Sequence, residues 1–209
     1  MTATQEITLF HSPNTRSTGV LILLEELGAK YQLHVLNMKA GEQRKAEYLA
    51  INPMGKVPAI KHGDAIITEQ VAVFLYLADL YPEAGLAPLI GDPLRGPYLR
   101  WMVFYGSCFE PALMDRSQNR KPAPQSTSPY GDFDTMFKTL TGQLGKGEYL
   151  LGDKFTAADV LWGTALTWVT LFKLVPISPT IQAYIDRVNT RPSVVWVREK
   201  NAELVATQG

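Results

Sequence analysis

Four polar residues in the short segment SPNTRS stand where a predicted strand gives way to a predicted helix. They are Ser12, Asn14, Thr15 and Ser17. The free backbone amides and the dipole at a helix N-terminus favour a negative charge, and a nearby hydroxyl adds a hydrogen-bond donor. The segment is therefore a candidate site for stabilising an anion. Each of these residue types is also a good helix cap, which is the plainer interpretation.

A proline at the start of a predicted strand marks the second candidate segment, Gly55-Lys56-Val57-Pro58. Proline has no backbone N–H, so in sheets it is confined to an edge, a bulge or the first residue of a strand. Its simplest role is to interrupt the strand. Lys56 supplies a positive charge beside it, although a solvated lysine is the ordinary case.

An acidic residue and an amide, Glu69 and Gln70, open a predicted helix in the third candidate segment. Free amides in the first turn of a helix can receive a carboxylate. Glu69 is also a favourable acid for a first turn whether or not a ligand binds there.

These segments lie in the first part of the chain, which alternates strands and helices. Strand signals cover residues 6–10 and 31–36, and a helix pattern runs between them from about Arg16 to Leu27. This order predicts a right-handed parallel crossover. Two further strands, Val57–Lys61 and Ala65–Thr68, read as an antiparallel hairpin, and a helix from Glu69 to about Leu80 follows.

The remainder of the chain has helical patterns only. A stretch rich in glycine and proline, residues 83–94, reads as a linker between domain 1–82 and domain 95–209. Amphipathic runs occupy residues 95–115, 132–144, 156–174, 180–190 and 193–205. Thr156 and Asp159 form a capping-box pattern, and the helix that they open is apolar nearly all round, which predicts a central position.

Composition narrows the class of protein and of partner. The chain has 209 residues, of which 46% are hydrophobic and 19% charged, with 20 basic and 20 acidic side chains. No net charge favours nucleic acid or an anionic membrane, and no apolar run is long enough for a membrane span. One cysteine and a first segment without signal-peptide features favour the cytoplasm. The three histidines have no acidic partners at metal spacing, so no metal is expected.

Taken in order, the motifs resemble those of the cytosolic glutathione transferase family across nearly the whole chain. The resemblance rests on Ser12-Pro13-Asn14-Thr15-x-Ser17, Asn52-Pro53-x-Gly55-Lys56-Val57-Pro58, Thr68-Glu69-Gln70 and the Phe155–Asp159 capping box. The first motif is similar to a serine-type, tau-like one, and a bacterial member is expected. The resemblance implies a thioredoxin-like α/β domain with a four-stranded mixed sheet, an all-α C-terminal domain and usually a homodimer.

The resemblance also implies a set of glutathione contacts. A cis bond between Val57 and Pro58 would turn the Val57 backbone toward an open groove, where the tripeptide could pair with it as an added strand. Glu69 and Gln70 would hold the γ-glutamyl end, although most of the family has serine in place of Gln70. The glycyl carboxylate needs a cation, for which Lys56 is favoured over Lys39.

The implied catalysis depends on the thiol of glutathione, since serine and threonine stand where redox relatives with this fold have Cys-Pro-x-Cys. A free thiol with a pKa of about 8.5 is only a few per cent thiolate at neutral pH. A hydroxyl and a helix N-terminus could lower this pKa by ~1–2 units. Ser12 is the leading candidate for the hydroxyl, and Asn14 and Thr15 are the alternatives.

The second substrate is expected in a pocket between the domains. The first helix of the second domain offers Trp101, Phe104, Tyr105 and Cys108, although an aromatic stripe at helical spacing is more often core. The predicted activity is conjugation of glutathione, the cosubstrate, to a small electrophile, as in detoxification. The alternatives are a glutathione-dependent peroxidase or disulfide reductase, or a non-catalytic interaction protein of the same fold.

Overall fold

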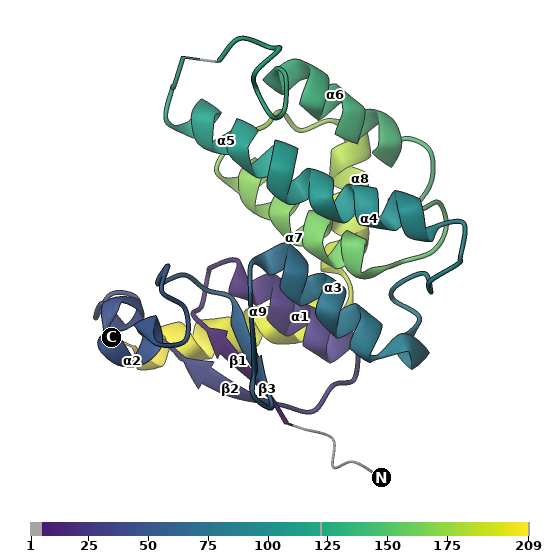
Figure 1. Cartoon of the computed structure of the whole chain (residues 1–209). Helices are drawn as coiled ribbons and strands as arrows, with labels where there is room; N and C mark the ends of the chain where they lie inside the picture. The colour runs from purple at the N-terminus through teal and green to yellow at the C-terminus, as the bar shows by residue number, and fades with distance from the viewer. Residues whose placement is uncertain (1–5, 122, 209) are drawn as a thin grey trace. The chain divides into compact units, whose positions relative to one another are not determined.

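The computed structural model describes residues 6–121 and 123–208 and divides the chain into two compact units. The sheet unit comprises Met1–Ala84 and Arg191–Gly209, and the helical unit comprises Gly85–Thr190. By its contacts the last helix lies in the sheet unit, whereas the predicted linker at residues 83–94 assigns it to the domain 95–209. Figure 1 shows the elements of each unit.

The sheet unit contains a four-stranded mixed sheet with the order β2-β1-β3-β4, as expected. Strands β1 (Ile7–His11) and β2 (Tyr31–Val35) are parallel and are connected through α1 (Ser17–Glu26). Strands β3 (Ala59–His62) and β4 (Ala65–Thr68) form the predicted hairpin, and β3 also pairs antiparallel with β1. Helix α3 (Gln70–Leu80) follows β4. The third strand begins at Ala59, two residues later than predicted, because Val57 and Pro58 form the connection that leads into it.

The two faces of the sheet have separate apolar layers. Phe10 and Ala59 are paired across β1 and β3, and both belong to a buried cluster with Tyr48 of the short helix α2 (Ala46–Leu49). A short 3-10 turn, η1 (Glu42–Arg44), precedes α2. The neighbouring pair Leu9 and Ile60 points to the opposite face, because successive side chains of a strand alternate. Helices α1 and α3 pack against each other and against this sheet (Figure 1).

Helix α9 (Pro192–Thr207) packs on α1 although about 165 residues separate them in sequence. The guanidinium of Arg191, at the N-cap of α9, donates to both carboxylate oxygens of Glu26 at 2.7 and 2.6 Å. Ser193 donates a further short hydrogen bond to Glu26. Periodicity predicts that residues 193–205 form a helix but does not say against which element the helix packs.

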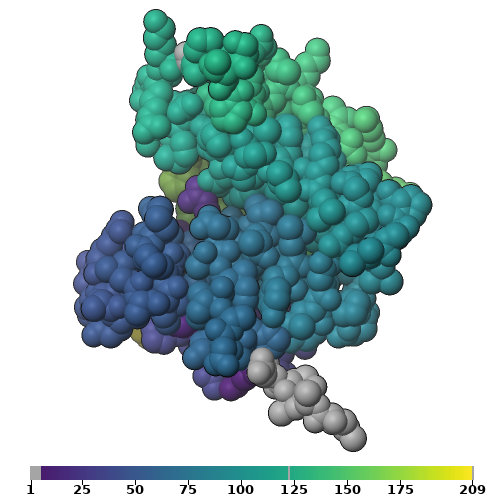
Figure 2. Space-filling view, viewed as in Figure 1, coloured from purple at the N-terminus to yellow at the C-terminus, as the bar shows by residue number. Residues whose placement is uncertain are grey.

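The helical unit is built around one buried helix. Its helices are α4 (Arg95–Phe104), α5 (Glu110–Ser117), α6 (Phe133–Leu144), α7 (Ala157–Leu171) and α8 (Pro179–Asn189), and the 3-10 turn η2 (Pro82–Ala84) precedes the unit. The capping box at Thr156 and Asp159 is confirmed, and the first turns of α7 are buried. Figure 2 shows that α4, α5 and α6 form the viewed surface of this unit. No helix in the described part of the chain is long and apolar enough to cross a membrane.

The predicted helix 95–115 is continuous but contains a π-helical turn, η3 (Tyr105–Phe109), between α4 and α5. The amide of Glu110 donates to the carbonyl oxygen of Tyr105, five residues earlier. Pro111 has no N–H and cannot donate to the Ser107 carbonyl, which favours a local widening of the helix here. The Ser107 hydroxyl donates to the carbonyl oxygen of Val103 at 2.8 Å and so satisfies a group near the irregular turn.

Candidate functional site

The Ser12–Thr15 turn lies between the end of β1 and the start of α1, as predicted. Ser12 is 3% exposed, Thr15 is half-buried and Asn14 is exposed. Asn14 has φ 58°, a left-handed conformation that asparagine tolerates better than most residues. The turn therefore directs Asn14 to solvent and keeps Ser12 against the body of the unit.

Hydroxyl groups hold the backbone of this turn. The Thr15 hydroxyl donates to the Ser12 carbonyl oxygen at 2.7 Å and lies 2.7 Å from the Ser17 hydroxyl. The Ser12 amide donates to Oγ of Ser17 at 3.1 Å. The Ser12 hydroxyl itself makes none of the hydrogen bonds found among residues 6–121 and 123–208. Of the turn's buried and half-buried hydroxyls, Ser12 thus keeps its hydroxyl free, while Thr15 and Ser17 use theirs within the turn.

A buried histidine next to the turn was not predicted to take part. His11 is 0% exposed, and its ring nitrogens lie 2.8 Å from Oγ of Ser17 and 2.8 Å from Oδ1 of Asn201. Burial lowers the pKa of His11, against the opposite effect of its hydrogen bonds to Asn201 and Ser17. The sequence held one usable signal: strand alternation places His11 on the same face as buried Leu9.

The bond between Val57 and Pro58 is cis, as the family resemblance implied. The Lys56 carbonyl oxygen before it accepts hydrogen bonds from the Tyr48 hydroxyl at 2.6 Å and from Nδ2 of Asn52 at 2.8 Å. Burial raises the pKa of Tyr48 to about 12, so its hydroxyl stays protonated as a donor. Within the described residues, the Val57 amide and carbonyl have no hydrogen-bond partner, which leaves an unpaired piece of backbone.

Gly55 is required by the close approach of two loops. Its φ is +59°, and a Cβ atom added there would lie 2.6 Å from the carbonyl oxygen of Gln43. Any other residue would therefore displace the segment that carries Lys56 and Val57.

Glu69 and Gln70 stand at the start of α3, as predicted. Glu69 is exposed with φ 64° and ψ 116°, an uncommon conformation for a residue other than glycine, and such conformations are concentrated at functional sites. The Gln70 side chain donates from Nε2 to the Arg16 carbonyl oxygen at 3.1 Å, which links α3 to the turn before α1. Its Oε1 is buried with no hydrogen-bond partner in the described part of the chain. The fold therefore brings the first and third motifs together.

The two candidate lysines, Lys39 and Lys56, are both exposed. Neither has an ion pair with another described residue. Both cations are therefore available to a ligand, and the contacts of the chain do not distinguish between them.

The expected aromatic pocket wall is largely the core of the helical unit. Trp101 and Tyr105 are 2% and 4% exposed and pack edge-on against Trp162, which donates from Nε1 to the Trp101 carbonyl oxygen at 3.0 Å. The two residues are four apart in sequence, so they lie on the same buried face of the continuous helix formed by α4 and η3. Phe104 and Cys108 are half-buried, and the Cys108 thiol donates to the carbonyl oxygen of Pro129 at 3.6 Å. Of the four predicted pocket residues, Phe104 and Cys108 thus retain appreciable accessible surface, and Trp101 and Tyr105 do not.

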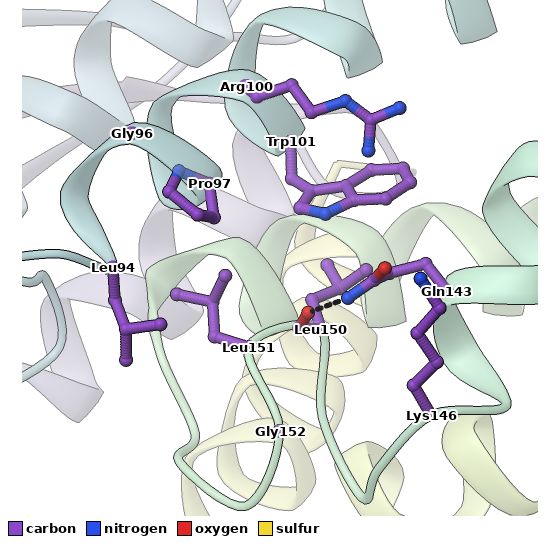
Figure 3. Close-up of a pocket in the computed structure, with 10 residues that line it drawn as sticks. All are labelled: Leu94, Gly96, Pro97, Arg100, Trp101, Gln143, Lys146, Leu150, Leu151 and Gly152. Atoms are coloured by element: carbon purple, nitrogen blue, oxygen red, sulfur yellow. Dashed lines mark hydrogen bonds between the residues drawn. The ribbon is translucent and has the colours of Figure 1, made fainter.

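The helical unit also has an open cavity of about 670 Å³, shown in Figure 3. The Arg100 guanidinium lies 4.0 Å from the centre of the Trp101 ring, and Lys146 is a second cation in the lining. Gln143 forms part of the wall, and its side chain donates to the Leu150 carbonyl oxygen at 2.7 Å. Of the predicted site residues, only the nearly buried Trp101 is in this lining. A smaller cavity of about 330 Å³ in the sheet unit contains none of them.

Among residues 6–121 and 123–208, no three His, Cys, Asp or Glu side chains are grouped as metal ligands.

Two family models match separate parts of the chain. The glutathione S-transferase N-terminal domain model matches residues 5–79, and the C-terminal domain model matches residues 104–192. Glutathione S-transferase F10 of Arabidopsis thaliana is 29% identical over 165 residues, covering 74% of this chain and 76% of the relative. The disulfide-bond oxidoreductase YfcG of Escherichia coli is 25% identical over 201 residues, covering 90% and 92%.

The fold likeness extends to solved structures. A glutathione transferase homolog from Sulfitobacter, crystallised with bound glutathione, has a TM-score of 0.74 and 27% identity, covering 93% of this chain and 98% of that one. Together the two domain models account for more than half of the sequence, so the chain belongs to the glutathione S-transferase family.

Proposed function

We propose that this protein binds glutathione, stabilises its thiolate and transfers it to a small electrophilic substrate. The observation that carries the proposal is the unpaired backbone of Val57, which lies beside a free cation, Lys56. An extended peptide can add to such a backbone as a short strand, and the tripeptide glutathione is of suitable length.

The start of α3 suits the γ-glutamyl end of glutathione. The first amides of a helix are free to receive its carboxylate. The exposed Glu69 carboxylate would pair with its ammonium group. Lys56 or Lys39 would neutralise the glycyl carboxylate at the other end.

We assign Ser12 as the hydrogen-bond donor to the sulfur of glutathione. Its hydroxyl is free among the described residues, and it would donate to the thiolate together with the dipole of α1. The thiolate then attacks an electrophilic carbon, a sulfur–carbon bond forms, and the leaving group departs with its electron pair. Stabilising the anion raises the fraction of reactive thiolate at neutral pH.

Disulfide reduction is the second candidate, because the relative YfcG is a disulfide-bond oxidoreductase. In this reaction the same thiolate attacks a sulfur atom of the disulfide, a mixed disulfide forms and a thiolate leaves. A second glutathione then releases the reduced product and oxidised glutathione. The two reactions need the same thiolate and differ in the acceptor, so both use the Ser12 turn.

Titration of the enzyme-bound thiol tests the proposal. Calorimetry with glutathione should give saturable binding, and thiolate absorbance against pH should give a thiol pKa below about 8.5. Ser12→Ala should raise this pKa by about one unit. If Asn14→Gly raises it instead, while Ser12→Ala leaves it unchanged, the donor is Asn14. Absence of binding at millimolar glutathione would refute the proposal.

Turnover with paired acceptors separates the two reactions. A panel of electrophilic aryl halides and of low-molecular-weight disulfides, each with glutathione, shows which acceptor is used. Cys108→Ala should retain turnover with either, because the proposed nucleophile is the thiolate of glutathione and not a thiol of the chain.

A further inference from the structure

The buried ring of His11 connects the Ser12 turn to the last helix of the chain. Its Nδ1 lies 2.8 Å from Oγ of Ser17 at the start of α1. Its Nε2 lies 2.8 Å from Oδ1 of Asn201 on α9. Asn201 is 5% exposed, and its Nδ2 donates to Oγ1 of Thr18 at 3.1 Å. Both ends of the Asn201 amide are therefore engaged, one with the ring and one with α1.

The Asn201 amide determines where the ring carries its proton. Burial lowers the pKa of His11, so the ring is neutral and holds a single proton. Oδ1 of Asn201 can only accept a hydrogen bond, which places that proton on Nε2. Nδ1 is then an acceptor, and the Ser17 hydroxyl donates to it. The Ser17 oxygen can then accept hydrogen bonds from its other neighbours.

Those neighbours are the groups that hold Ser12. The Ser12 amide donates to Oγ of Ser17 at 3.1 Å. The single proton of the Thr15 hydroxyl has two acceptors at 2.7 Å, the Ser12 carbonyl oxygen and Oγ of Ser17. The Ser12 amide is thus held by the Ser17 hydroxyl, whose orientation follows from His11, and the Ser12 carbonyl oxygen is held by the adjoining Thr15 hydroxyl. These contacts fix the backbone of Ser12 and so the direction of its Cα–Cβ bond, which limits its hydroxyl to the staggered positions about that bond.

We propose that His11 and Asn201 are positioning residues for the Ser12 hydroxyl, with α9 closing the network from the far end of the sequence. The effect of this network on catalysis rests on the proposed function, in which the Ser12 hydroxyl stabilises the thiolate. Its effect on the order of the turn does not depend on any ligand, so the two can be tested apart.

Replacing Asn201 by leucine, which has a similar size but no acceptor, removes the partner of Nε2. In the full chain without ligand, we expect amide hydrogen exchange at Ser12 to accelerate about tenfold, as for loss of one buried hydrogen bond. With glutathione bound, we expect the thiol pKa to rise by roughly half a unit, with a smaller change in glutathione affinity. If Asn201→Leu does not fold, Asn201→Ser shortens the side chain and serves the same purpose.

Gln208→Leu is the matched control. Gln208, the C-cap of α9, donates from Nε2 to the Leu36 carbonyl oxygen at 3.4 Å, and among the described residues it makes no hydrogen bond to the Ser12 turn. It should leave both Ser12 exchange and the thiol pKa as in the wild type. Unfolding curves for both variants separate a local effect from a general loss of stability.

The outcomes distinguish this inference from the proposed function. Unchanged Ser12 exchange and thiol pKa in Asn201→Leu, while Ser12→Ala still raises the thiol pKa, overturn the positioning role and leave the function intact. If Ser12 exchange is faster in Asn201→Leu but the wild-type protein binds no glutathione, the positioning role is supported and the proposed function is refuted.

Discussion

Tyr184 donates a hydrogen bond of 2.9 Å to the buried carboxylate of Asp159 and so ties α8 to the start of α7. The same carboxylate accepts from the Leu150 amide at 2.9 Å, the Thr156 amide at 2.9 Å and the Thr156 hydroxyl at 3.0 Å. Asp159 is 0% exposed. A residue read from sequence as a helix cap therefore also joins two helices and a loop.

Asp159→Ala should lower the free energy of unfolding by about 3 kcal/mol, because it leaves several buried donors without an acceptor. Tyr184→Phe removes only one of these donors and should cost about 1 kcal/mol. Urea unfolding of both variants checks the order. Equal losses would mean that the carboxylate contributes no more than its bond to Tyr184.

The ion pair between Glu26 and Arg191 should make the packing of α9 dependent on pH. Burial raises the pKa of Glu26, but the hydrogen bonds from Arg191 and Ser193 and the charge of Arg191 outweigh it, so the net shift is downward. A carboxyl whose pKa is lower in the folded state stabilises the fold above its unfolded pKa, and this stability is lost as the pH falls through the folded value. We therefore expect this stability to be lost at pH values below the ordinary pKa range of glutamate.

Glu26→Gln should therefore cost about 2 kcal/mol at neutral pH and should flatten the acid side of the stability profile. Urea midpoints measured from neutral to acid pH give both quantities. Lys200→Met is the control, since it removes an exposed pair with Glu203 on the same helix and should change stability by less than about 1 kcal/mol. A Glu26→Gln profile parallel to that of the wild type would rule out this source of pH dependence.

Gly55→Ala should destabilise the sheet unit by about 2 kcal/mol, because the new Cβ would meet a backbone oxygen at 2.6 Å in a left-handed conformation. The substitution should also weaken glutathione binding, since Val57 follows two residues later. Calorimetry and thermal unfolding measure the two effects.

Gly142→Ala is the matched control for this prediction. Gly142 lies within α6, and an added Cβ would meet no atom within 4 Å. Alanine in a helix interior should stabilise the protein by up to about 1 kcal/mol and leave glutathione binding unchanged. If Gly55→Ala behaves like Gly142→Ala, the close approach to Gln43 does not constrain the loop.

The sequence by itself determined the local elements and the family. The spacing of apolar residues predicted the strands and helices, and the Thr156–Asp159 pattern predicted the capping box, because both depend on contacts within a few residues. The motifs around Ser12, Val57 and Glu69 indicated the family for the same reason, as each is a continuous segment.

Only the tertiary structure decided which segments meet. The pairing of α9 with α1, the burial of Trp101 and Tyr105 against Trp162, and the bond of Gln70 to the Arg16 carbonyl all join segments distant in sequence. The contact of His11 with Asn201 spans 190 positions, and neither residue has a local pattern that points to the other. Periodicity fixes the face that a helix buries but not the partner that covers it, because many packings satisfy the same apolar stripe.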